Sequence, residues 1–448
     1  MPYPTQIFKA YDIRGLLEEV TPEIAQAVAK VFVHKMNAKT VVVGRDMRAT
    51  SPELAKALIA GAQSAGANVV DIGMVTTSLF NFAVSSDDSI DAGFMVTASH
   101  NPAIWNGIKM ALSNGLPVAG KEVLEWLQEN EEVPLGEPGT VETRNYQDAY
   151  LNAVIERSAV AGVDLSGVKL VVDYGNGMGA LTIHSLLERL GITAIELFAE
   201  PDANFPNHEA NPAKFETLAD LQARVLSEGA DFGVALDGDG DRLAFVDNEG
   251  KIITGDLTLA LIGAFLLKSE KGKVVGAPNQ GWAVRDAIAA AGGEYIDTLI
   301  GRAFLIRAIA NEGALLGGEI SGHQMYRAMA NLESIDFGLC TMLRLWKESG
   351  KTLADLVRPL RTFVSSGEVN AEAENKDEIL KRITDHFVPL ATSSNTMDGI
   401  RCDFSHDWWF IVRPSNTEPV LRITVEATSE ELMKEKVAEL VAFVTSSS

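Results

Sequence analysis

Three aspartates separated by glycines form the segment DGDGDR, which begins at Asp237, and their spacing favours metal chemistry. Hard cations such as Mg²⁺ or Ca²⁺ prefer oxygen ligands, and three carboxylates on one turn repel each other unless a cation neutralises them. We therefore expect Asp237, Asp239 and Asp241 to hold a divalent ion. An EF-hand is excluded, because its sixth and twelfth positions are occupied here by Arg242 and Asn248 instead of glycine and glutamate. An acidic surface turn is the remaining alternative, whereas Arg242 suits a phosphate held against the metal.

Two further segments have side chains suited to phosphate and to sugar hydroxyls. RPSNTEP, which begins at Arg413, offers an arginine, two hydroxyls, an amide and backbone N–H groups, a combination that can grip a phosphate dianion. A polar hairpin turn is its alternative. GEISGH carries Glu319, Ser321 and His323 at alternate positions, and its carboxylate can accept hydrogen bonds from two vicinal hydroxyls. An ordinary loop explains GEISGH equally well.

A serine next to a histidine occurs in TASHNP, which begins at Thr97. A serine hydrolase is disfavoured, because its nucleophile would lie in G-x-S-x-G. Neighbours in an extended segment also point to opposite sides, which places His100 badly as a base for Ser99. Beside a metal segment and a phosphate segment, Ser99 makes more sense as a carrier of phosphate, with Lys109 in WNGIKM and Arg14 in AYDIRG as its cations. A plain turn is the alternative.

The segment KLVVDYGNGMGA offers a competing chemistry. A predicted strand leads into Gly175, Gly177 and Ala180, and Glu196 follows about 20 residues later, which satisfies much of the dinucleotide-binding fingerprint. Glycines also permit a tight strand-to-helix turn. We favour the turn, because a dehydrogenase would leave the other polar segments unexplained, and an NAD-dependent oxidoreductase is kept as an alternative of a different class.

The elements that must position these segments alternate between strand and helix. TVVVGRD, SPELAKALIAGAQSAG and NVVDIG predict a strand, a helix and a strand, an order typical of α/β layers with a largely parallel sheet. A weak internal repeat is also present: FMV leads into TASHNP, GVAL into DGDGDR and ALLG into GEISGH. We expect three similar domains in which these segments occupy the same place, at the carboxyl ends of the strands, where open α/β sheets bind ligands.

The pattern changes after residue 365. IRCDF, WWFIVRP and LRITVEA, followed by the helical TSEELMKEKVAELVAFV, predict an antiparallel meander with a packing helix. The predicted fold class is α/β, with three similar mixed α/β domains followed by a smaller α+β C-terminal domain. We place the four domains at residues 1–148, 149–252, 253–365 and 366–448.

Composition excludes several classes of protein. A chain of 448 residues with a net charge of −23 and a pI near 4.7 lacks the basic face that nucleic acids or anionic membranes require. The first residues lack the apolar core of a signal peptide, and the longest nearly apolar run, LTLALIGAFLL, is shorter than the roughly 20 residues that span a bilayer. Cys340 and Cys402 show no metal-ligand spacing, so we expect no disulfide, no zinc site and a cytoplasmic location.

In this order, the segments resemble the α-D-phosphohexomutase family, and within it the bacterial phosphomannomutase/phosphoglucomutase group. The match runs from AYDIRG through TASHNP, NGIK, DGDGDR and GEISGH to RPSNTEP, so it covers essentially the whole chain. The resemblance implies four domains around a central cleft, Mg²⁺ as the metal and a phosphoserine. The implied metal ligands are Ser99, Asp237, Asp239 and Asp241. The residues implied around the reacting phosphate are Arg14, His100, Lys109 and Arg242, and His323 matches a further active-site position in the GEISGH loop. The residues implied in substrate binding are Tyr11, Glu319, Ser321, Arg413, Ser415, Asn416 and Thr417.

The activity that the resemblance implies is a mutase that interconverts hexose 6-phosphate and hexose 1-phosphate, with mannose and also glucose as the sugar. Phosphate stored on Ser99 is donated to the free hydroxyl, and the resulting hexose 1,6-bisphosphate turns over inside the cleft before its other phosphate is taken back. Sugar phosphates are then the partners, and a monomer or homodimer is expected. The general acid or base is left open among His100, Lys109 and His323.

Two departures from the family pattern leave the preferred sugar open. Ile320 in GEISGH agrees with the GEMSGH of this group better than with the GEQSGH of phosphoglucosamine mutases. Arg302 stands where relatives often carry lysine or histidine, and GAPNQGW lacks a lysine that some relatives use. A phosphoglucosamine mutase and a non-catalytic sugar-phosphate binding protein therefore remain alternatives.

Overall fold

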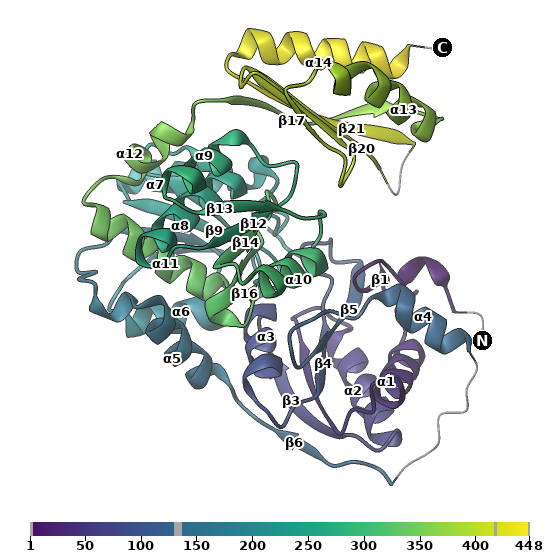
Figure 1. Cartoon of the computed structure of the whole chain (residues 1–448). Coiled ribbons are helices and arrows are strands. Elements are labelled where there is room, and N and C mark those ends of the chain that lie inside the picture. Colours follow the sequence, from purple (N-terminus) through teal and green to yellow (C-terminus); the bar gives the residue numbers. More distant parts are fainter. Residues whose placement is uncertain (1–2, 130–136, 416–418, 447–448) are drawn as a thin grey trace.

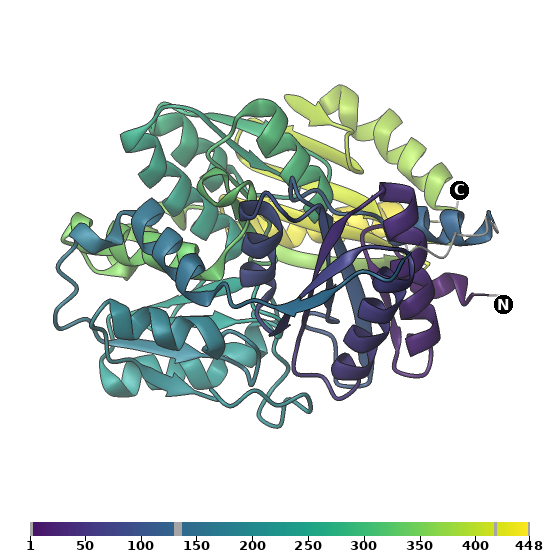
Figure 2. The ribbon, with the colours of Figure 1, turned by 90° about the horizontal axis from the view of Figure 1, so that it is seen from below.

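Four sheets with their helices follow one another along the chain (Figure 1). The computed structural model describes residues 3–129, 137–415 and 419–446. Figure 2, seen from below, shows the C-terminal sheet behind the domains that are built on the first three sheets. The predicted fold class, with three mixed α/β domains and a smaller antiparallel C-terminal domain, is confirmed.

The first sheet has the strand order β1-β5-β4-β2-β3-β6. Its strands β4, β2, β3 and β6 are parallel, and β5 and β1 add antiparallel pairings at one edge. The strands are β1 (Ile13–Leu16), β2 (Thr40–Arg45), β3 (Asn68–Met74), β4 (Ala92–Val96), β5 (Trp105–Leu112) and β6 (Val141–Thr143). The helices are α1 (Pro22–Met36), α2 (Ser51–Ser64), α3 (Thr77–Ser86) and α4 (Gly120–Gln128).

Helices on both faces explain why β2 reads as an unbroken apolar run. Val41 and Val43 join the core formed with α1 and α2, whereas Val42, which points to the opposite face, joins the core that contains Leu79 and Phe80 of α3. A strand covered on both sides needs apolar residues at every position, unlike a strand with one solvated face.

The second and third sheets repeat the same plan. The second sheet has the order β11-β10-β9-β7-β8 and the third the order β13-β12-β14-β15-β16. The second domain contains β7 (Leu170–Asp173), β8 (Ile195–Leu197), β9 (Phe232–Leu236), β10 (Leu243–Asp247), β11 (Ile252–Ile253), α5 (Gln147–Ser158), α6 (Ala180–Arg189) and α7 (Ala219–Glu228). The third contains β12 (Lys273–Gly276), β13 (Glu294–Asp297), β14 (Leu316–Gly318), β15 (Gln324–Tyr326), β16 (Leu332–Glu333), α8 (Gly255–Ser269), α9 (Trp282–Ala290), α10 (Arg302–Glu312), α11 (Ile335–Ser349) and α12 (Leu353–Val357).

The internal repeat predicted from the sequence appears in the strand pairing. In each of these three sheets, a central strand (β2, β7 or β12) pairs in parallel with the two strands that follow it in the chain. The strand after those two (β5, β10 or β15) pairs antiparallel with the second of them. TASHNP joins β4 to β5, DGDGDR joins β9 to β10, and GEISGH overlaps the connection from β14 to β15. The three polar segments therefore occupy the same topological place.

The C-terminal sheet is antiparallel throughout, in the order β17-β21-β20-β19-β18. Its elements are β17 (Val364–Glu372), α13 (Lys376–Phe387), β18 (Ser393–Asn395), β19 (Ile400–Phe404), β20 (Trp408–Pro414), β21 (Val420–Ala427) and α14 (Glu430–Thr445). The consecutive strands β19, β20 and β21 form the predicted meander, and α14 packs against β21 and β17.

One apolar core runs through the second and third domains and includes α3 of the first, whereas the C-terminal domain has a core of its own. Helix α11 packs against α5, α6 and α8, so it joins the second and third domains. Both cysteines are buried and unpaired. Within the described residues, no helix has the length and apolar character that a membrane span requires.

Candidate active site

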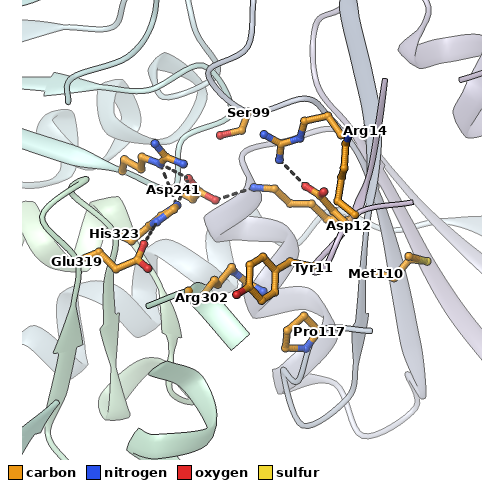
Figure 3. A pocket seen from close by; sticks show the side chains of 14 residues that line it. Tyr11, Asp12, Arg14, Ser99, Met110, Pro117, Asp241, Arg302, Glu319 and His323 are labelled. Atoms are coloured by element: carbon orange, nitrogen blue, oxygen red, sulfur yellow. Dashed lines mark hydrogen bonds and ion pairs between the residues drawn. The ribbon is translucent and has the colours of Figure 1, made fainter. Parts of the chain in front are cut away.

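The carboxyl ends of strands from the first three sheets meet at one cleft, which is shown in Figure 3. Its volume of about 330 Å³ lies within the usual range of small-molecule sites. Glu319 and His323 lie on one side of the cleft, and Arg14 and Asp12 lie on the other (Figure 3). The lining residues are Lys9, Tyr11, Asp12, Arg14, Ser99, Lys109, Met110, Pro117, Asp241, Arg242, Gly301, Arg302, Glu319 and His323.

The aspartates of DGDGDR form a buried cluster that fits a hard cation. Asp237, Asp239 and Asp241 each place a carboxylate oxygen within 4.8 Å of the others. Asp239 Oδ1 is buried without a hydrogen-bond donor, and the cation nearest to the buried Asp241 Oδ1 is the His323 ring, whose Nε2 lies 3.2 Å away. Buried carboxylate oxygens are costly unless a cation or a donor satisfies them, so these oxygens match the donor set that Mg²⁺ requires.

Backbone amides shape this cluster. Asp237 Oδ1 accepts hydrogen bonds from the amides of Gly240, Asp241 and Arg242 at 3.0–3.1 Å. Burial and the carboxylates of Asp241 and Asp239 raise the pKa of Asp237 well above its ordinary value, whereas the charges of Arg242 and Lys109 act in the opposite direction. Ionisation of Asp237 is therefore coupled to nearby positive charge.

Lys109 brings such a charge from the first domain. Its Nζ lies 2.6 Å from Asp239 Oδ2 and 2.7 Å from Asp241 Oδ2. Burial alone would lower the pKa of Lys109, but the two carboxylates raise it above its ordinary value. Thr77, at the start of α3, donates to the same Asp239 oxygen at 2.6 Å. Sequence reasoning missed Thr77, because a threonine at a helix start normally indicates only a cap.

Ser99 lies directly beside the aspartate cluster. It follows β4, is only 2% exposed, and has its Oγ 3.2 Å from Asp237 Oδ2. Its φ of 53° is left-handed, a conformation that residues other than glycine adopt infrequently. The contact joins residues 138 positions apart, so it depends on the packing of the first domain against the second.

The expectation that His100 points away from Ser99 is wrong. His100 Nδ1 lies 3.1 Å from Ser99 Oγ. The prediction assumed an extended chain, but the left-handed Ser99 turns the backbone so that both side chains reach the same side. Burial, together with the charges of Arg242 and Arg14, lowers the pKa of His100 to about 2, so its ring is neutral at physiological pH.

His323 has the opposite charge state. Its Nδ1 lies 2.6 Å from Glu319 Oε2, and its Nε2 lies 3.2 Å from Asp241 Oδ1. Burial and Arg242 act to lower its pKa, but the two carboxylates outweigh them and raise the pKa of His323 to about 9. The ring is therefore protonated near neutral pH. Arg242 Nε lies 3.0 Å from His323 Nε2 and 3.7 Å from Asp237 Oδ2, which adds a second cation to this side of the cleft.

The sugar-binding candidates of GEISGH lie together. Ser321 Oγ donates to Glu319 Oε2 at 3.2 Å. Burial would raise the pKa of Glu319, but the hydrogen bond and charge of His323 hold it below its ordinary value, so the carboxylate is ready to accept hydroxyl hydrogens. An isolated bridge between Arg242 and His323 ties this loop to the metal loop.

Arg14 and Tyr11 come from the start of the chain. Arg14 Nη1 donates to Asn101 Oδ1 in TASHNP at 3.0 Å, and Nη2 pairs with Asp12, a residue that the motifs did not single out. The Tyr11 hydroxyl donates to the carbonyl of Ile300 at 3.3 Å. Both candidates therefore reach the cleft, where Arg14 contacts the loop that carries Ser99 and Tyr11 contacts the third domain.

Arg413 and Ser415 do not line this cleft, although a chain of contacts leads to them. Asp398 Oδ2 accepts from the amide of Ile300 at 2.7 Å, and Asp398 Oδ1 accepts from Arg413 Nε at 3.1 Å. Asp398 thus bridges Arg413 and Ile300, the residue whose carbonyl group Tyr11 contacts. The Ser415 amide donates to Val420 O at 3.1 Å. Asn416 and Thr417 lie outside the described residues.

The GNGMGA segment packs against DGDGDR. The amide of Met178 donates to Gly238 O at 2.9 Å. A Cβ on Gly177 would lie 2.8 Å from the carbonyl oxygen of Asp237, a distance that only glycine permits. The turn packs directly on DGDGDR, which supports the tight-turn interpretation over a dinucleotide site.

Arg302, the departure noted in the sequence, lines the cleft from the start of α10. Its Nη2 lies 2.7 Å from Glu333 Oε2 and 3.3 Å from Asn81 Oδ1. The Glu333 side chain is fully buried, so Arg302 supplies the charge that it needs while it faces the cleft.

Family models match four consecutive stretches of the chain. They describe phosphoglucomutase/phosphomannomutase alpha/beta/alpha domain I at residues 5–132, domain II at 148–250, domain III at 254–363 and the C-terminal domain at 368–443. Together they cover most of the sequence and agree with the resemblance that the motifs carry.

Similar proteins share the whole length of the chain. A phosphomannomutase of Escherichia coli K12 is 36% identical over 94% of this chain and 95% of its own. A probable phosphoglucosamine mutase of Methanopyrus kandleri is 35% identical over 98% of this chain and 97% of its own. The crystal structure of a phosphoglucomutase/phosphomannomutase family protein from Burkholderia thailandensis matches with a TM-score of 0.89 and 30% identity over 98% of this chain and 97% of its own. With its four matched domains and these full-length relatives, the chain belongs to the phosphoglucomutase/phosphomannomutase family.

Proposed function

We propose that the chain is a Mg²⁺-dependent phosphohexomutase that interconverts hexose 6-phosphate and hexose 1-phosphate, acting on mannose and also on glucose phosphates. Phosphate is carried by Ser99, and a hexose 1,6-bisphosphate is the intermediate. One observation carries the proposal: the Ser99 hydroxyl lies 3.2 Å from a carboxylate of the buried aspartate cluster, inside a cleft lined by Arg14, Lys109 and Arg242.

Phosphoryl transfer depends mainly on positioning and on neutralising charge. In the forward step, a P–O bond forms to the free sugar hydroxyl, which loses its proton, while the bond from phosphorus to Ser99 Oγ breaks and Oγ gains a proton. Arg14, Lys109 and Arg242 stabilise the phosphoryl oxygens, and the raised pKa of His323 adds a positive charge beside them. Mg²⁺ held by Asp237, Asp239, Asp241 and the Ser99 phosphate would neutralise further negative charge.

The sugar and its second phosphate need separate contacts. We assign Glu319 and Ser321, with Tyr11, to the sugar ring and its hydroxyls. The segment that begins at Arg413 and includes Ser415, Asn416 and Thr417 is assigned to the phosphate that is not reacting. The contact chain from Tyr11 through Ile300 and Asp398 to Arg413 supports this assignment, because it joins the cleft to the C-terminal domain. Such a second site would retain the bisphosphate while it reorients.

Peptide mass mapping before and after incubation with glucose 1,6-bisphosphate and Mg²⁺ tests the proposal. We expect phosphate on the peptide that contains Ser99, and we expect mannose 1-phosphate or glucose 1-phosphate to remove it. Ser99→Ala should abolish isomer exchange in phosphorus NMR, whereas Ser113→Ala, which changes an exposed serine of the same domain, should retain it. Full turnover by Ser99→Ala would refute the mechanism.

The probable phosphoglucosamine mutase relative favours a second sugar. The same assay with glucosamine 1-phosphate separates the candidates. If glucosamine 1-phosphate removes the Ser99 phosphate at least about 10-fold faster than mannose and glucose 1-phosphates do, the chain is a phosphoglucosamine mutase and the sugar assignment above is wrong.

A further inference from the structure

We propose that Arg48 is a positioning residue that holds the loop carrying Ser99 in its reactive conformation. The inference rests on the proposed function, because it concerns how the phosphate carrier is held. Arg48 does not line the cleft and is only 1% exposed, so it acts through the loop and not on the substrate.

All five N–H groups of the Arg48 guanidinium have a matching acceptor. Four of them point to backbone carbonyl oxygens of residues 99–105, the loop that carries Ser99 together with the first residue of β5. Nη2 lies 3.0 Å from the carbonyl oxygen of Ser99 and 2.6 Å from that of Asn101. Nη1 lies 2.8 Å from the carbonyl oxygen of Pro102 and 2.9 Å from that of Trp105. A guanidinium has five donors in a fixed planar arrangement, so a single arginine side chain can bind four carbonyl groups of the loop at once.

The fifth donor anchors Arg48 to its own domain. Nε lies 3.1 Å from Asp46 Oδ2, and Asp46 is itself held by the Ser51 hydroxyl at 2.5 Å and the Arg48 amide at 3.0 Å. Asp46 is also only 1% exposed. Because these groups lie between the end of β2 and the start of α2, the loop is fastened to regular structure of the first domain.

The second domain closes the other side of the Ser99 carbonyl. A Cβ on Gly238 would lie 2.6 Å from the Ser99 oxygen, so the metal loop approaches the serine loop as closely as glycine allows. The Phe205 ring lies 5.5 Å from the Arg48 guanidinium carbon. The Ser99 carbonyl is thus held between Arg48 and the metal loop, which fixes the direction in which Oγ points.

This arrangement explains how Ser99 keeps its left-handed backbone. A φ of 53° is unfavourable for serine, and it persists where surrounding contacts impose it. With its carbonyl fixed by Arg48, the serine presents Oγ to Asp237 and to His100. If the loop relaxes, Oγ moves relative to the metal cluster, and displacements of about 1 Å cost about 100-fold in rate at enzyme sites.

Arg48→Lys tests the proposal, because it keeps the positive charge beside Asp46 but removes the planar fork. Arg401→Lys is the matched control. Arg401 is also buried, at 2% exposure, and its Nη1 lies 2.6 Å from the carbonyl oxygens of both Pro278 and Gln280. Like Arg48, it pairs with an aspartate two residues away, Asp403. Both variants should lose stability to a similar degree.

The kinetic outcome separates positioning from general stability. We expect Arg48→Lys to lower kcat about 100-fold while KM changes by less than about threefold, because the substrate contacts are left in place. Arg401→Lys should keep kcat within about threefold of the wild type. In the bisphosphate assay, phosphorylation of Ser99 should slow by the same factor as kcat in Arg48→Lys. A kcat within about threefold of the wild type in Arg48→Lys would overturn the proposal.

Two other outcomes are separate from the kinetic result: an inactive wild type, and a variant that does not fold. If the wild type itself exchanges no sugar phosphates, the proposed function fails, whatever Arg48 does. If Arg48→Lys does not fold, Asp46→Asn carries the test, since it keeps the shape of the anchor but removes its charge. We then expect kcat to fall about 10-fold at unchanged KM, and an unchanged kcat would overturn the positioning role.

Discussion

Replacing Lys109 by methionine is the sharpest test of the electrostatics of the cleft. The change removes the ammonium group that lies 2.6 Å from Asp239 and 2.7 Å from Asp241, and it keeps a side chain of similar length. The carboxylates of both aspartates are fully buried, so water cannot replace the lost charge. His323 Nε2, 3.2 Å from Asp241 Oδ1, and Arg242 Nε, 4.0 Å from it, stay as partners of Asp241.

The expected loss of stability follows from burial. Removing one member of a buried ion pair costs about 3–5 kcal/mol, because the remaining charge is left without compensation. We expect Lys109→Met to lose about that much free energy of unfolding when EDTA is present. Mg²⁺ supplies the missing charge, and saturation to about 100 times Kd stabilises a protein by about 2.7 kcal/mol. Excess Mg²⁺ should therefore stabilise the variant at least about 1 kcal/mol more than it stabilises the wild type.

Urea unfolding at neutral pH, in EDTA and in excess MgCl₂, measures both effects. Lys273→Met is the control, because Lys273 Nζ also lies 2.6 Å from a carboxylate, that of Glu312, but with side chains 33% and 39% exposed. Surface pairs contribute only about 0–1 kcal/mol. Equal stabilities of the two variants in EDTA, with equal responses to Mg²⁺, would refute the reasoning that the cluster needs a buried cation.

Three further changes have definite outcomes. Burial raises the pKa of Asp336 from 3.8 to about 6, so the folded state favours the protonated carboxyl. The contribution of this protonation to the free energy of unfolding is complete below the unfolded pKa and is lost as the pH rises through about 6. In urea unfolding, the wild type should lose about 1–2 kcal/mol relative to Asp336→Asn between about pH 5 and about pH 8, and parallel pH profiles would contradict this. Gly177→Ala, whose Cβ would meet the metal loop at 2.8 Å, should lose about 1–3 kcal/mol and weaken Mg²⁺ binding in calorimetry, whereas Gly162→Ala, with nothing within 4 Å, should change neither. Arg302→Met should lower the free energy of unfolding by about 3–5 kcal/mol because it leaves Glu333 buried and unpaired, and a second change, Glu333→Gln, should recover part of that loss.

Much of the fold could be predicted because it is encoded over short stretches of chain. The apolar run of β2, the helix α2 and the strand β3 lie where the sequence places them. The meander β19-β20-β21 was likewise predictable from strand patterns separated by turns. The repeat of an apolar strand followed by a polar loop also predicted that three active-site segments occupy equivalent positions. The reason is that equivalent strands of similar domains end at the same edge of their sheets.

The side chains that complete the site were less predictable. Arg48 lies in GRDMR, at the end of a predicted strand, but no local pattern shows that its guanidinium binds four carbonyl groups of a loop about 50 residues later. Thr77 reads as part of a helix start, although it donates to Asp239, which is 162 residues away. Such contacts join segments that only the packing of two domains brings together.

The sequence by itself determined the types of group that this protein uses, since residue type fixes donor capacity and charge: three carboxylates on a tight turn, a serine among cations, and a carboxylate in a glycine-rich loop. The tertiary structure alone decided their distances and charge states. Ser99 and His100 are neighbours in the chain, yet a single left-handed φ brings their side chains to 3.1 Å. His100 and His323 are the same residue type, yet burial beside arginines lowers one pKa to about 2 and paired carboxylates raise the other to about 9. A pKa depends on the charges and water within a few ångströms, and folding decides those neighbours.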